Sequence, residues 1–174
     1  DADAGSTVAY SLSGADADDF EIVNNTLALK EAADFETKSS YAVTVTASDG
    51  ENTATQAVTY TITDANDNAP VFTSNAAVSI VENTKGPTLL ETTDADTNST
   101  VSYSLSGADA DDFEIVNNTL ALKVAADFES GKTAYAVTVT ADDGENTATQ
   151  AVTYTITDSN DNAPVFADVN YDIS

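Results

Sequence analysis

The chain of 174 residues contains no cysteine, histidine, tryptophan or methionine. Without cysteine it has neither a disulfide framework nor a thiolate metal site. Without histidine it cannot form a histidine-based catalytic triad. No apolar run approaches the roughly 18 residues of a membrane-spanning helix, so we expect no direct membrane insertion.

Basic residues are also scarce: five lysines and no arginine stand against 30 acidic residues, for a formal net charge of −25. Such a charge repels phosphate backbones and anionic lipid, which argues against nucleic-acid and membrane-surface partners. The acidity has two readings: it keeps an exposed protein soluble, or its carboxylates bind hard cations. The positions of the acidic residues, described below, favour cation binding.

The composition offers few of the groups that enzymes use for catalysis. The sequence has no glycine-rich phosphate loop. Paired carboxylates could in principle hydrolyse a glycoside, but there is no tryptophan platform for a sugar. We therefore expect that the protein is not an enzyme.

The chain repeats itself. Residues 1–30 recur with three differences as residues 94–123, and residues 41–72 recur with two differences as residues 135–166. Near-copies in tandem are typical of stalks and arrays rather than of catalytic domains. If each repeat begins after Asn-Asp-Asn-Ala-Pro, residues 69–162 form one complete repeat. Residues 1–68 then form a repeat that lacks its first two strands, and residues 163–174 form the first strand of a following repeat.

Each copy reads as a series of short strands. In residues 135–141, Tyr135, Val137 and Val139 alternate with alanine and threonine, which is the two-residue period of a half-buried strand. Further strands are expected at residues 77–81, 88–92, 100–105, 113–116, 119–123 and 152–157. This density of short strands predicts an all-β fold of tandem Greek-key, immunoglobulin-like sandwiches.

Acidic residues gather where the expected strands end. The second copy has a Glu-Asn pair at residues 82–83, Asp-x-Asp at 94–96, Asp-x-Glu at 127–129 and Asp-x-Asn-Asp-Asn at 158–162, and the first copy repeats most of these. Together these motifs resemble the calcium motifs of cadherin repeats, and the resemblance covers essentially the whole chain. It implies sandwiches joined by calcium-binding linkers. The chemistry agrees, because calcium takes its six to eight oxygens from carboxylates, amide carbonyls and backbone carbonyls.

The resemblance implies Ca2+ as the bound ion, held mainly at a central junction between the two copies. The residues expected there are Asp34, Glu36, Asp64, Asn66, Asp67, Asn68, Glu82, Asp94, Asp96 and Asp143. Partial sites are expected towards the two ends, from Asp1, Asp3, Asp49, Asp127, Glu129, Asp158, Asn160, Asp161 and Asn162. An EF-hand fits poorly, because a loop starting at Asp94 would have Leu105, not glutamate, at its twelfth position.

The expected function is structural: a calcium-rigidified extender repeat of an extracellular, cell-surface adhesin that serves calcium binding and cell adhesion. Its partners would be neighbouring repeats of the same protein, with like chains or a surface ligand reached through other domains. Composition favours a bacterial source. Two alternatives stay open, namely calcium-dependent homophilic adhesion by the repeats themselves and a carbohydrate-binding module.

Overall fold

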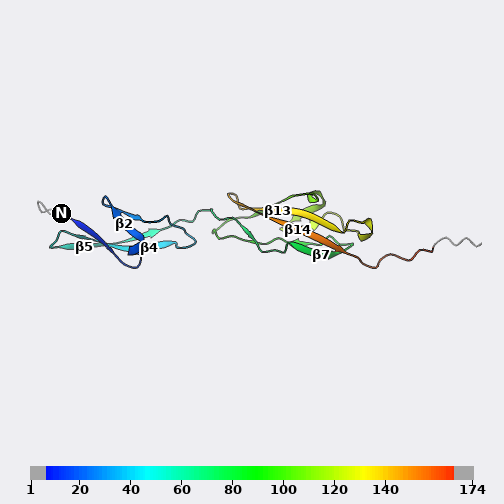
Figure 1. Cartoon of the computed structure of the whole chain (residues 1–174), viewed down its shortest axis with the longest axis horizontal. Coiled ribbons are helices and arrows are strands. Elements are labelled where there is room, and N and C mark those ends of the chain that lie inside the picture. The colour runs from blue at the N-terminus through cyan, green and yellow to red at the C-terminus, as the bar shows by residue number, and fades with distance from the viewer. Residues whose placement is uncertain (1–6, 167–174) are drawn as a thin grey trace, which may run out of the picture. The chain divides into compact units, whose positions relative to one another are not determined.

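The computed structural model describes residues 7–166, which fall into two compact units (Figure 1). Unit 1 is Asp1–Asp67 together with Ala95–Asn98, and unit 2 is Asn68–Asp94 and Ser99–Ser174. The described residues contain strands and three short 3-10 helices but no α-helix, which confirms the all-β prediction. None of their helices is long or apolar enough to cross a membrane.

Unit 1 has a three-stranded antiparallel sheet of order β1-β4-β5 and a two-stranded hairpin, β2-β3. Phe20 and Val43 are its buried core residues. The bounds are β1 (Ala9–Ser13), η1 (Ala17–Asp19), β2 (Phe20–Val23), β3 (Thr26–Leu29), β4 (Ser40–Ser48) and β5 (Thr53–Thr61).

Unit 2 repeats this arrangement with more strands. Its sheets have the orders β10-β13-β14-β7 and β11-β12-β8, and β6 pairs with β9. The bounds are β6 (Val71–Phe72), β7 (Ala77–Val81), β8 (Thr88–Leu89), β9 (Thr92–Thr93), β10 (Ser102–Ser106), η2 (Ala110–Asp112), β11 (Phe113–Val116), β12 (Thr119–Leu122), η3 (Phe128–Ser130), β13 (Ala134–Asp142) and β14 (Thr147–Thr157).

The core of unit 2 follows from strand alternation. Val137 and Val139 of β13, and Val152 and Tyr154 of β14, are all buried, whereas Thr153 and Thr155 of β14 stay exposed. The Phe113 ring packs edge-on against Tyr154, with ring centroids 5.1 Å apart. The two facing sheets therefore enclose one apolar layer, as in an immunoglobulin-like sandwich.

Two predicted segments differ in the structure. The single strand expected at residues 88–92 is two strands, because β8 pairs with β12 while β9 pairs with β6. Leu90, between them, is buried in the core, so the chain crosses from one pairing partner to another at this point. The strand expected at residues 163–174 lies mostly outside the described residues, and residues 164–166 do not form a strand.

The pairing of β7 with β14 decides where the ends of these strands lie. It is parallel, with Ile80 opposite Ile156 and Val81 opposite Thr157 (Figure 1). The residues that follow β7 and β14 therefore emerge at the same end of the sheet.

Candidate metal centres

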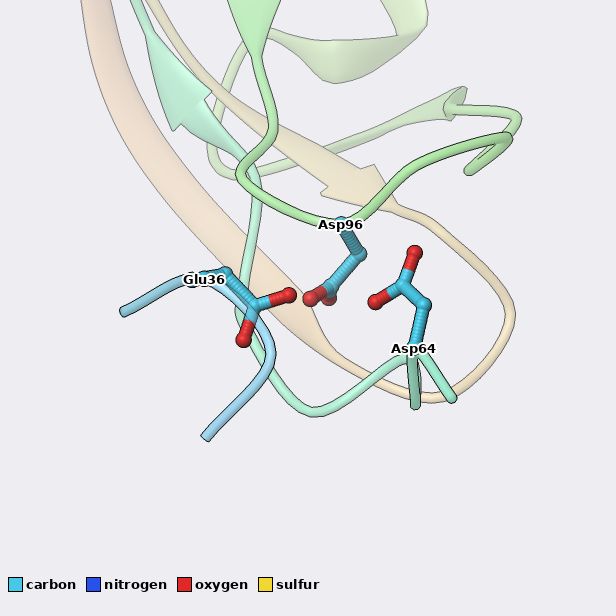
Figure 2. Close-up of side chains that lie close together, drawn as sticks. All are labelled: Glu36, Asp64 and Asp96. Atoms are coloured by element: carbon cyan, nitrogen blue, oxygen red, sulfur yellow. The ribbon is translucent and has the colours of Figure 1, made fainter. Parts of the chain in front are cut away.

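A first carboxylate cluster lies within unit 1. Glu36 comes from the loop between β3 and β4, Asp64 follows β5, and Asp96 belongs to the segment Ala95–Asn98. One carboxylate oxygen from each residue lies within 4.8 Å of the others. Figure 2 shows the three side chains converging from separate loops.

Local hydrogen bonds fix these loops. The Asp34 carboxylate accepts the Glu36 N–H at 3.0 Å and the Thr37 hydroxyl at 2.7 Å, a short turn that sets the position of Glu36. The Asp64 carboxylate accepts the Thr97 N–H at 2.8 Å and also the Thr97 hydroxyl. Thr97 thus holds Asp64 beside the Asp96 loop, a contact that the acidic motifs alone did not indicate.

The like-charged carboxylates of the first cluster repel one another. The Thr97 hydroxyl is the main cause that holds the pKa of Asp64 below its ordinary value. A hydrogen bond from its own N–H favours the charged form of Glu36, but desolvation and the neighbouring Asp34 and Asp64 carboxylates raise the pKa of Glu36. A cation would relieve this repulsion.

A second cluster lies within unit 2 and consists of Glu82, Glu129 and Asp161, again with one oxygen from each within 4.8 Å of the others. Glu82 was expected in the central set, whereas the structure brings its carboxylate together with those of two residues expected for an end site. The reason is the parallel pairing of β7 with β14, which brings residue 82 beside the segment after residue 157.

Glu82 is almost fully buried, at 2% exposure. Its carboxylate accepts the Phe128 N–H at 2.8 Å and the Ser159 N–H at 2.7 Å. These bonds, first Phe128 and then Ser159, hold the pKa of Glu82 below its ordinary value. Two kinds of influence compete at Glu129. A hydrogen bond from its own N–H favours the charged form, but desolvation and the charges of Glu82 and Asp161 raise the pKa of Glu129. Asn83, another contact missed from the sequence, donates to Asp161 at 2.5 Å.

The other expected residues have several environments. Asp143 is buried at 8% exposure and accepts the Glu145 and Asn146 N–H groups, and Asp49 accepts the corresponding Glu51 and Asn52 N–H groups. Asp127 caps η3 by accepting the Ser130 N–H, and Asn162 donates to Asp161. Asp1 and Asp3 lie outside the described residues. Asp158 lies beside Glu82 and is among the groups that lower the pKa of Glu82. Asp67 and Asp94 are described but belong to neither triad, and the amide residues Asn66, Asn68 and Asn160 are described as well.

The donor set fits a hard cation. Both clusters offer only carboxylate oxygens, the ligand type that calcium prefers. Asp64 Oδ1 is buried and accepts no hydrogen bond from the described part of the chain, as expected of an atom reserved for another partner.

Comparison with solved structures identifies the fold. Human protocadherin-24 EC1-2 matches with a TM-score of 0.69 and 24% identity, covering 87% of this chain and 82% of that chain. The protocadherin gammaB7 EC3-6 cis-dimer structure matches with a TM-score of 0.76 and 27% identity, covering 90% of this chain and 42% of that chain. Mouse cadherin-23 EC22-24 matches with a TM-score of 0.71 and 23% identity, covering 87% of this chain and 53% of that chain.

These matches define the class of protein: the chain consists of cadherin-like repeats with an immunoglobulin-like sandwich fold. It spans most of the protocadherin-24 fragment but less than half of the gammaB7 fragment. No protein-family model matches the sequence, and no curated protein matches it either.

Proposed function

We propose that the chain is a non-catalytic extender segment of an extracellular, cell-surface adhesion protein, and that calcium bound by its loop and linker carboxylates rigidifies it. The observation that carries this proposal is the recurrence of carboxylate triads, Glu36–Asp64–Asp96 in unit 1 and Glu82–Glu129–Asp161 in unit 2. Likeness to the protocadherin gammaB4 extracellular domain, at 26% identity over 90% of this chain, supports the setting outside the cell.

The proposed ligands form two sets, each gathered around one triad. The residues added to the triads come from the motif resemblance. The first set is Asp34, Glu36, Asp64, Asn66, Asp67, Asn68, Asp94, Asp96 and Asp143. The second set is Glu82, Asp127, Glu129, Asp158, Asn160, Asp161 and Asn162.

The side chains around the triads have defined tasks in this proposal. Asp34 and Thr97 position Glu36 and Asp64 through hydrogen bonds, so that the loops are ordered before an ion arrives. Bound calcium supplies positive charge that offsets the repulsion among the carboxylates. The motif resemblance implies that ions held by the linker residues 64–68 make the linker itself less flexible.

Calorimetric calcium titration of the full chain tests the proposal. We expect saturable binding with a dissociation constant of about 10⁻⁴ to 10⁻³ M or tighter, as in extracellular calcium modules. Asp64→Asn should weaken the first set and Glu82→Gln the second, and the two losses should add, since the sets share no residue. Asp18→Asn, an exposed acid in neither triad, is the matched control. A chain that takes up no calcium at millimolar concentration would refute the proposal.

Stiffening is tested separately. Dye pairs attached at engineered cysteines, one in each unit, should report a narrower distance distribution in calcium than in chelator. The absence of native cysteine makes such labelling specific. Equal widths in both conditions would contradict the rigidifying role even if calcium binds.

Association between like chains is a second candidate function. It is favoured by the match to a protocadherin cis-dimer structure that covers 90% of this chain. Analytical ultracentrifugation in calcium and in chelator distinguishes it from a pure spacer, which stays monomeric in both.

A further inference from the structure

Both units carry the same two-residue turn at the tip of a β-hairpin. Residues 24–25 join β2 to β3 in unit 1, and residues 117–118 join β11 to β12 in unit 2. All four are asparagines, with positive φ between 49° and 62°. Two-residue hairpin turns favour positive φ at both central positions, and asparagine adopts it more readily than most residues. The turn geometry therefore accounts for asparagine at these positions.

The first asparagine of each turn also begins the pattern Asn-x-Thr. Residues 24–26 read Asn-Asn-Thr, and residues 117–119 read the same. This pattern, with any residue except proline in the middle, marks asparagines that accept N-linked sugars on secreted proteins. It recurs at the same position of the repeat in both units. A three-residue pattern also arises by chance, so the surroundings of each asparagine are the stronger test.

The surroundings leave both acceptor side chains accessible. Asn24 and Asn117 are exposed, and within residues 7–166 neither side-chain amide takes part in a hydrogen bond. The Thr119 hydroxyl donates to the Asn117 carbonyl at 3.4 Å, so the hydroxyl that completes the pattern lies at the acceptor residue. The Asn118 carbonyl accepts the Leu90 N–H at 2.8 Å, which attaches the second turn residue to the core. The turn therefore presents its first asparagine to solvent on a fixed base.

Exposed apolar surface adjoins each acceptor. The residue before it is a valine, Val23 at 48% exposure in unit 1 and Val116 at 56% in unit 2. In unit 2 the same row continues across the sheet through Thr119 to Leu89, which is 53% exposed. A sugar ring attached at the turn would find apolar surface to cover with its own C–H face, which removes that surface from water.

We propose that Asn24 and Asn117 are acceptors for N-linked sugars, one at the same hairpin tip of each repeat. The inference rests on the extracellular setting of the proposed function, because such sugars belong to secreted proteins, but it does not rest on calcium. In the transfer, the side-chain amide nitrogen bonds to the anomeric carbon of a phosphate-activated sugar. The bond from that carbon to the phosphate oxygen breaks, the phosphate leaves with the electron pair, and the amide proton passes to a base. Nothing is oxidised or reduced.

A third match to the pattern, at residues 98–100, does not belong to the proposal. Asn98 is exposed and has φ 67°, but it follows Thr97, whose N–H and hydroxyl donate to the Asp64 carboxylate. A sugar there would crowd the loop that holds the first carboxylate cluster. The position also does not recur, because the first copy has Gly5 in place of Asn98.

Peptide mapping of the protein isolated from its own cells tests the assignment. Trypsin cuts after lysine, so Asn24 falls in the peptide that ends at Lys30 and Asn117 in residues 86–123. Fragment masses locate any attached sugar, and we expect it on both Asn24 and Asn117. A preassembled oligosaccharide indicates a lipid-linked donor, a single hexose indicates a nucleotide-linked donor, and either supports the proposal. An unmodified chain, or a chain modified at Asn98 alone, overturns it.

Expression of the full chain in two hosts tests whether the pattern itself is read. One host transfers lipid-linked oligosaccharide during secretion, and the other carries a transferase that uses a nucleotide-linked hexose. In the host that modifies the native chain, Thr119→Ala should abolish the sugar on Asn117 and leave that on Asn24, and Thr119→Ser should restore it. Thr26→Ala should have the opposite selectivity. No sugar in either host, or an undiminished sugar on Asn117 in the Thr119→Ala chain, overturns the proposal.

Failure of this inference is distinguishable from failure of the proposed function. If the native protein binds calcium but carries no sugar at either turn, the acceptor assignment fails and the calcium-binding role stands. If both turns carry sugar but the chain takes up no calcium, the assignment stands and the calcium-binding role fails.

Discussion

One pair of lysines, Lys38 and Lys132, makes the same contacts in the two units. Lys132 contacts Asp109 at 2.8 Å and Asp112 at 2.7 Å, and its ammonium lies 4.2 Å from the centre of the Tyr135 ring. Lys38 repeats this arrangement with Asp16, Asp19 and Tyr41. Exposed ion pairs contribute little to stability by themselves. In unit 2, however, Asp109 also accepts the Ala136 backbone N–H at 2.7 Å.

At the residue scale this gives a pH-dependent prediction. The Ala136 N–H, and next the Lys132 ammonium, hold the pKa of Asp109 below its ordinary value of 3.8. A lowered folded-state pKa adds stability that is present above the unfolded-state pKa and is lost as the pH falls through the folded-state pKa. In chelator, Asp109→Asn should therefore reduce the acid dependence of urea unfolding between about pH 5 and pH 2. Asp111→Asn, an exposed neighbour on η2, should leave the slope unchanged, and an equal effect of both would contradict the assignment.

At the element scale, the turn after β7 depends on one glycine. Gly86 has φ +57, and a Cβ added there would lie 2.5 Å from Cγ2 of the buried Ile80. A side chain at this position would both strain the backbone and displace a core residue.

We therefore expect Gly86→Ala to destabilise unit 2 by about 2–5 kcal/mol, the sum of about 1–2 kcal/mol of left-handed strain and about 1–3 kcal/mol of core overpacking. Gly131→Ala is the matched control, because Gly131 has φ +85 but nothing within 4 Å of an added Cβ. It should cost only the left-handed strain, about 1–2 kcal/mol at most. Differential scanning calorimetry compares the two, and a Gly131 variant that melts lower than the Gly86 variant would show that the Ile80 contact is unimportant.

The individual strands show what could and could not be predicted from the sequence. Alternation located β7, β11 and β13 because each has one buried face, which a two-residue period records directly. The break at Leu90 was missed because residues 88–92 have strand-forming composition throughout, and only tertiary pairing divides them. The neighbours of Glu82 were not predicted for a similar reason: they depend on a parallel partner strand more than 70 residues away, which no local motif indicates.

At the scale of the whole molecule, charge dominates. Acidic side chains concentrate in loops at the strand ends, and a formal net charge of −25 opposes compaction. Ions can relieve this in two ways: any salt screens the repulsion, while specific ligation stabilises the folded state by mass action. The two effects are separable because screening depends on ionic strength and ligation on the identity of the ion.

The last prediction uses that difference. In calcium at about 100 times its dissociation constant, each ligated site should add about 2.7 kcal/mol to the unfolding free energy, so chelation should lower the melting temperature by several degrees. Sodium chloride at matched ionic strength should recover only a small part of this loss. The combined Asp64→Asn and Glu82→Gln variant should respond to calcium and sodium alike, because it retains the remaining charge but lacks a carboxylate in each triad. If sodium restored the native chain as fully as calcium does, the acidity would serve general solubility and the ligation proposal would be wrong.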